Sequence, residues 1–124
     1  MAFLRVLAKM IDDGEHNEDL NTKLVFHLKV DDSNHVDLKM ESFGYNECWE
    51  IEQERYVKYP FILIDSGIQG KRCKLSYEGL DDVSNDLLNL DSKEIQEGVT
   101  FTYFECSFDP PPESVYRIES VRPL

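Results

Sequence analysis

The chain has 124 residues, 41% of them hydrophobic, which is the size and composition of one globular domain covering residues 1–124. Its 25 acidic residues outnumber its 13 basic residues, giving a formal net charge of −12. Such an excess repels phosphate groups and anionic lipids, so it argues against direct nucleic-acid binding and against a membrane surface. It favours a positively charged protein as partner.

We expect no signal peptide in the N-terminal residues, because Arg5 and Lys9 interrupt the apolar stretch, and no run reaches membrane-spanning length. The three cysteines, Cys48, Cys73 and Cys106, fit neither a disulfide framework nor a zinc pattern. We therefore expect a cytoplasmic protein with free, mostly buried thiols and no metal or cofactor.

Residues 2–11 fit two structures. A helix would place Arg5 and Lys9 on one polar side, whereas a strand would line up the apolar residues at even positions from 2 to 10 on one face. No helix-capping residue precedes the segment, which favours the strand. A polar loop with five carboxylates follows, and its spacing does not match a calcium-binding loop.

Residues 24–30 and 36–41 alternate between apolar and polar side chains, and the turn-forming residues 31–34 separate them. This pattern predicts a β-hairpin with Leu24, Phe26, Leu28 and Val30 facing inward. Between residues 41 and 59, a short helix and an irregular strand both fit.

Residues 61–64 are apolar without alternation, which predicts a central strand covered on both faces. Residues 71–77 alternate again, with Cys73, Leu75 and Tyr77 inward.

A second acidic block lies in residues 79–98, where leucines at helical spacing predict a short helix across the mouth of a barrel. Residues 99–104 and 115–121 are rich in β-branched and aromatic residues and predict a terminal β-pair. Three prolines at 110–112 separate the two strands. The whole pattern predicts a mainly β fold: an antiparallel barrel-like or strongly curved sheet with one or two short helices. An α+β fold with an N-terminal helix is the alternative.

The sequence contains no nucleophile elbow, phosphate loop or metal-binding spacing, and its histidines, His16, His27 and His35, stand apart from any catalytic motif. We therefore expect a protein that is not an enzyme. In general character it looks like the small acidic proteins of bacteria that neutralise toxins, so the leading hypothesis is an immunity protein that inhibits a cationic nuclease-type toxin.

This hypothesis assigns partner binding to the two acidic blocks and to two aromatic anchors, in a monomer or weak dimer. The residues are Asp12, Asp13, Glu15, Glu18, Asp19, Tyr45, Trp49, Asp81, Asp82, Asp86, Asp91 and Glu94. Two alternatives remain: a DNA mimic that captures a DNA-binding protein, and a small structural or adaptor β domain of a bacterial or phage assembly.

Overall fold

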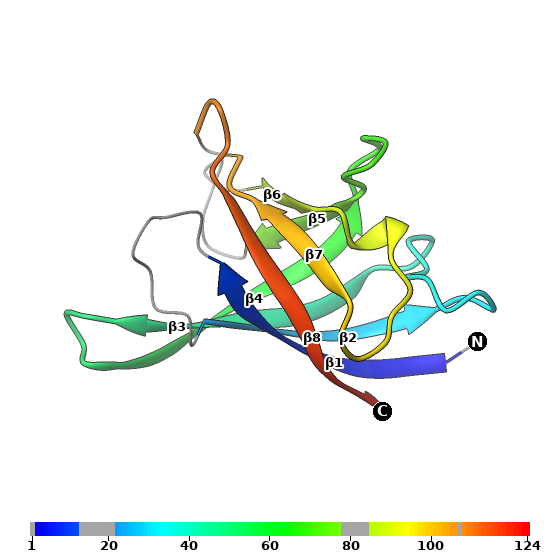
Figure 1. Ribbon diagram of the computed structural model, residues 1–124, viewed down its shortest axis with the longest axis horizontal. Helices are drawn as coiled ribbons and strands as arrows, with labels where there is room; N and C mark the ends of the chain where they lie inside the picture. Colours follow the sequence, from blue (N-terminus) through cyan, green and yellow to red (C-terminus); the bar gives the residue numbers. More distant parts are fainter. Residues whose placement is uncertain (1, 13–21, 78–84, 107) are drawn as a thin grey trace.

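The fold is a closed antiparallel barrel, seen in a computed structural model that describes residues 2–12, 22–77, 85–106 and 108–124 (Figure 1). Each strand pairs with the next along the chain, and the last pairs with the first to close the barrel. The strands are β1 (Ala2–Asp12), β2 (Lys23–Val30), β3 (Ser42–Glu50), β4 (Arg55–Asp65), β5 (Cys73–Tyr77), β6 (Asn85–Leu88), β7 (Thr100–Phe104) and β8 (Glu113–Pro123). One 3₁₀ turn, η1 (Leu90–Ser92), lies between β6 and β7.

The predicted mainly β, antiparallel barrel is confirmed. The alternative with an N-terminal helix is wrong, because β1 forms hydrogen-bonded ladders with both β2 and β8. The described part of the chain contains no helix with the length and hydropathy of a membrane span.

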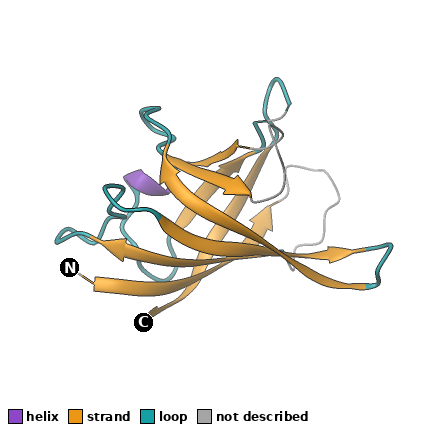
Figure 2. Cartoon of the chain, turned by 180° about the vertical axis from the view of Figure 1, so that it is seen from behind, coloured by secondary structure: helices purple, strands orange, loops and turns teal. Residues whose placement is uncertain are grey.

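The up-and-down topology gives the barrel two different ends (Figure 2). The η1 end carries η1, the start of β1 and the connections 31–41 and 66–72. The hairpin end carries the turn between β3 and β4, a hairpin that projects beyond the rest of the barrel (Figures 1 and 2).

Side chains fill the interior, as expected of a barrel with only eight strands. The four inward residues predicted on β2 are buried. Phe26 packs against Phe61 and Phe101 with ring centroids 5.5 and 6.2 Å apart, and Phe101 stacks on Tyr116. Aromatic contacts therefore link β2, β4, β7 and β8 across the barrel.

The predicted hairpin is half right. Its first strand is β2, but the partner is β3, and residues 36–41 form a loop with one isolated bridge from Val36 to Val30. The Asp31 side chain accepts hydrogen bonds from the backbone N–H groups of Ser33 and His35, which turns the chain away from β2. Val36 in this loop is buried at the η1 end. Burial of a loop residue therefore accounts for part of the alternation that predicts a strand at residues 36–41.

Two other predictions are wrong in part. Residues 61–64 belong to β4, but Phe61 and Leu63 are buried while Ile62 is 40% exposed, so only one face is covered. The helix expected within residues 79–98 partly falls outside the described residues. Its described part is β6 followed by η1. Pairing of β6 with both β5 and β7 overrides the helical spacing of the leucines.

Gly44 of β3 permits a close approach between β2 and β3. It lies between Phe26 and Phe61 in the ladder. A Cβ atom at this position would overlap the carbonyl oxygen of Val25 and lie 3.0 Å from Cζ of Phe61. The two phenylalanine rings therefore meet over a residue that has no side chain.

Candidate functional site

A cavity of about 600 Å³ opens at the hairpin end of the barrel. β1, β3, β7 and β8 contribute to it, with walls that include Met10, Asn46, Trp49, Tyr103 and Tyr116. The projecting β3–β4 hairpin extends one wall through Ile51. The cavity is therefore lined by apolar and aromatic side chains with a few polar groups, as ligand sites in proteins commonly are.

A chain of hydrogen bonds lies beside this cavity. The Asn46 amide Nδ2 donates to the Tyr77 hydroxyl at 3.3 Å, and the Tyr77 and Tyr103 hydroxyls are 2.9 Å apart. The Tyr103 hydroxyl donates to Oδ2 of Asp86, whose Oδ1 accepts from the backbone N–H of Cys106 at 3.3 Å. The chain thus joins β3, β5, β7 and β6 through their side chains.

Burial sets the protonation of this chain. Asp86 is only 6% exposed, and burial raises its pKa, while the hydrogen bonds from Tyr103 and Cys106 oppose that rise. Burial also raises the pKa of Tyr77 to about 12 and that of Tyr103 well above its usual value. Both tyrosines therefore keep their protons at neutral pH.

The second feature of the hairpin end is a set of three exposed apolar side chains with acidic residues on the same hairpin. We call Trp49, Ile51 and Tyr56 together the hairpin surface. Ile51 is 81% exposed, and Trp49 and Tyr56, 41% and 43% exposed, pack edge to face with ring centroids 5.2 Å apart. The acidic side chains on the same hairpin are Glu47, Glu50, Glu52 and Glu54.

One hydrogen bond braces the base of this hairpin across its two strands. The Tyr59 hydroxyl donates to Glu50, and this bond raises the pKa of Tyr59 to about 12. Glu52 and Glu54, in the turn, are exposed.

The structure separates the predicted contact residues. Trp49 and Asp12 lie at the hairpin end, whereas Asp91 and Glu94 lie at the η1 end. The predicted acids that lie outside the described residues are Asp13, Glu15, Glu18, Asp19, Asp81 and Asp82.

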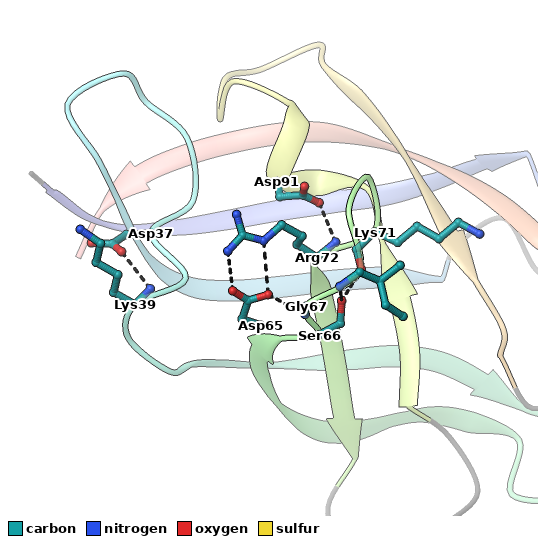
Figure 3. A network of polar contacts seen from close by, with 9 residues as sticks. Asp37, Lys39, Asp65, Ser66, Gly67, Lys71, Arg72 and Asp91 are labelled. Carbon is teal, nitrogen blue, oxygen red and sulfur yellow. Dashed lines mark hydrogen bonds and ion pairs between the residues drawn. The ribbon is translucent and has the colours of Figure 1, made fainter.

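Asp91 has a structural partner at the η1 end. Its Oδ1 accepts the backbone N–H of Arg72 at 3.0 Å, and the Arg72 guanidinium pairs with Asp65 (Figure 3). The hydrogen bond from Arg72 holds the pKa of Asp65 below its usual value. Asp91 therefore helps to join η1 to the connection between β4 and β5.

Two other predicted contact residues have structural roles. Asp86 is buried with both oxygens hydrogen-bonded, so it is corrected from a contact residue to an internal acceptor. Tyr45 is half-buried on the barrel wall, where Lys58 Nζ lies 4.8 Å from its ring centroid and Arg5 donates to its hydroxyl at 3.5 Å.

Sequence reasoning did not assign the acids of the hairpin to partner binding, and it missed the hydrogen-bond chain. The acids of residues 47–54 alternate with Trp49 and Ile51, but the turn between the strands contains no glycine, proline or asparagine to mark it. Its positive-φ residue is Glu54. The chain from Asn46 to Asp86 joins residues 40 positions apart and has no local signal.

The side chains that could bind a metal ion or act as nucleophiles do not cluster within the described residues. Within the described ranges, no three His, Cys, Asp or Glu side chains gather to hold a metal ion. Cys73 is buried and Cys48 half-buried, but Cys106 is exposed just beyond β7, contrary to the expectation of a buried thiol. His27 is half-buried against Phe43, with ring centroids 5.0 Å apart.

Comparisons with protein-family models, with curated proteins and with solved structures found no significant match to this chain.

Proposed function

We propose that this protein acts without catalysis, by binding and neutralising a basic protein through the hairpin surface. A cationic nuclease-type toxin is the partner class that we favour, which would make the chain an immunity protein. The observation that carries the proposal is the projecting hairpin, where Trp49, Ile51 and Tyr56 are exposed. The same hairpin carries four glutamates against two bases, Arg55 and Lys58.

The hairpin surface has the composition of a binding hot spot. Exposed aromatic residues provide contact area at low entropic cost, and surrounding charges set the approach of the partner and its specificity. Trp49 and Tyr56 pack against each other, so they are partly ordered before a partner arrives. The net charge of −12 would accelerate encounter with a positively charged surface.

Charge neutralisation at the hairpin gives the first test. We expect E52Q/E54Q to slow association with the captured basic partner about threefold at low salt and to flatten the dependence of the on-rate on salt. Stopped-flow or biolayer measurements at several salt concentrations provide the readout, with a partner isolated from native lysate at low salt.

The matched control is E94Q/E97Q. It removes the same charge from two exposed glutamates at the opposite end of the barrel. If both double variants slowed association equally, only the net charge would matter, and the hairpin surface would be the wrong contact site.

The aromatic anchor gives a second test. We expect W49A to raise the off-rate of the same complex about tenfold while changing the on-rate little. Trp49 is exposed in the free protein and would contribute apolar area that becomes buried in the complex, and it carries no charge. An unchanged off-rate would remove Trp49 from the interface.

One observation favours the adaptor alternative. Phe43 and Ile62 are cross-strand partners and both are exposed on the outer face of β3 and β4. A structural domain could use this apolar pair to pack against a neighbouring subunit. In that case F43S would abolish association with the neighbouring subunit, whereas W49A and E52Q/E54Q would leave this association unchanged.

A further inference from the structure

Basic residues gather on one side of this acidic barrel, on strands β8, β1 and β2, which are neighbours in the closed sheet (Figure 1). Together these strands contain six lysines and arginines and three acids, whereas the whole chain has 13 basic and 25 acidic residues. Buried apolar residues of the same strands fill the barrel, and strand alternation places the bases on its outer face. The six bases are Arg5, Lys9, Lys23, Lys29, Arg117 and Arg122. These strands therefore reverse the charge balance of the chain.

Two of these bases face each other without a counterion. Arg5 and Arg122 are directly opposite in the ladder between β1 and β8, and both are exposed. Like charges at directly opposed positions destabilise a sheet. The acid closest in sequence to Arg122 on β8 is Glu119, which lies at a register shift and pairs with Arg117 at 3.4 Å. Within the described residues, neither Arg5 nor Arg122 forms an ion pair, so a bound anion would relieve their repulsion.

A groove lies beside this arginine pair. It has a volume of about 240 Å³, and it is lined by Arg5, Leu7, Ser120 and Arg122. Leu7 and Ser120 form the next outward pair of the ladder, and both are half-buried. Arg5 leans over β2, where its guanidinium donates to the Tyr45 hydroxyl of β3 at 3.5 Å. The groove therefore has a guanidinium on each of its two strands and one hydroxyl donor.

The donors of this groove match a phosphate group. A guanidinium presents parallel N–H groups to an oxyanion, so two guanidiniums and a hydroxyl can serve three oxygens. A phosphate monoester carries a charge of about −1.5 to −2 near neutral pH, which two arginines balance. A monocarboxylate has a smaller charge and fewer oxygens. The groove therefore favours phosphate over carboxylate.

The charge of the whole protein limits the size of the ligand. The formal charge of −12 repels an extended polyanion such as a nucleic acid, and it repels an anionic membrane. A small ion responds mainly to the charges within a Debye length, which is about 8 Å at physiological ionic strength. The charged residues that line the groove are both arginines. A small phosphorylated molecule is therefore the ligand class that fits.

We propose that the groove between β1 and β8 binds the phosphate group of a small molecule. The guanidinium groups of Arg5 and Arg122 and the hydroxyl of Ser120 donate to the phosphate oxygens. The groove shares no residue with the hairpin surface, so this binding is independent of the proposed capture of a basic protein.

Titration of the isotope-labelled full chain, followed by amide chemical shifts in NMR spectra, tests this assignment. The probes are phenyl phosphate, benzoate, a short oligonucleotide and vesicles that contain phosphatidic acid. We expect millimolar phenyl phosphate at low salt to give saturable shifts at residues 5–7 and 120–122, and benzoate to bind at least tenfold more weakly. The absence of saturable shifts at these residues, or equal affinity for benzoate, would overturn the proposal. Tighter binding of the oligonucleotide or of the vesicles would also overturn it, because the ligand would then be a polyanion or a membrane.

Variants of one arginine locate the phosphate group. We expect R122Q to lower phenyl phosphate affinity at least tenfold, while the melting temperature without ligand stays equal or rises because a like-charge pair has been removed. R122K keeps the charge but loses the planar fork, so we expect a severalfold loss of affinity.

The matched control is K9Q, which removes one positive charge from the outer face of β1 outside the groove. We expect K9Q to change phenyl phosphate affinity less than twofold. If K9Q and R122Q weakened binding equally, the attraction would come from the basic face in general, and the groove would not be the site. Wild-type affinity in R122K would contradict recognition by a guanidinium.

Discussion

Replacing Gly44 by alanine is expected to destabilise the barrel by about 3 kcal/mol, at the upper end of the usual cost of overpacking. The added Cβ would overlap the Val25 carbonyl oxygen, which is part of the backbone and cannot rotate away. Relief of the overlap requires β2 and β3 to separate beside Phe26 and Phe61, whose rings are in contact. Urea unfolding, compared through midpoint and slope, measures the loss.

Gly67 offers the control for this substitution. It has a φ of +75° and nothing within 4 Å of an added Cβ, so G67A tests backbone strain without steric overlap. We expect G67A to cost about 1 kcal/mol. If G44A were no more destabilising than G67A, the close approach of β2 and β3 would not be a determinant of the fold.

The second large effect is expected from Tyr103→Phe, which removes the hydroxyl that donates to Asp86. The buried carboxylate would keep only the hydrogen bond from the Cys106 backbone. Losing a hydrogen bond to a buried charged group costs about 2 kcal/mol. We expect that loss in the free energy of unfolding at pH 7.

The pH dependence of this loss has a defined sign. Burial already raises the pKa of Asp86 above its unfolded value of 3.8, and removing the Tyr103 hydrogen bond would raise it further. A carboxyl group with a raised pKa contributes stability that is complete below the unfolded pKa and is lost as pH rises through the folded pKa. The difference between wild type and Y103F should therefore shrink as pH falls from 7 toward 4.

Urea unfolding at pH 4 and pH 7 tests this sign. In the D86N background, the pH-dependent part of the Y103F effect should disappear, because no carboxylate remains at position 86. A Y103F effect of equal size at both pH values would show that Asp86 is not the group that loses its donor.

The class of fold could be predicted from the sequence because local alternation decides it. β2 and β7 carry apolar and β-branched residues at a period of two, and β7 pairs with β8 as the pattern at residues 99–104 and 115–121 predicted. The even-numbered apolar residues of β1 likewise indicated a strand. Such alternation can be recognised from residues that are close together in the sequence.

Strand partners and the candidate site could not be predicted in the same way. Residues 36–41 alternate like a strand but form a loop, because β3 provides the ladder for β2. Asp86 has the sequence context of a surface acid, but pairing of β6 buries it beside Tyr103.

The sequence by itself determined that the protein is acidic and mainly β. Its net charge is the sum over its residues, and the alternation that marks a strand is visible within a few consecutive residues. Only the tertiary structure decided that Trp49 and Asp91 lie at opposite ends of the barrel, and that Asn46, Tyr77, Tyr103 and Asp86 form one chain. The physical reason is barrel closure. The hydrogen-bond register between strands distant in sequence fixes which side chains meet inside and which acids remain at the surface.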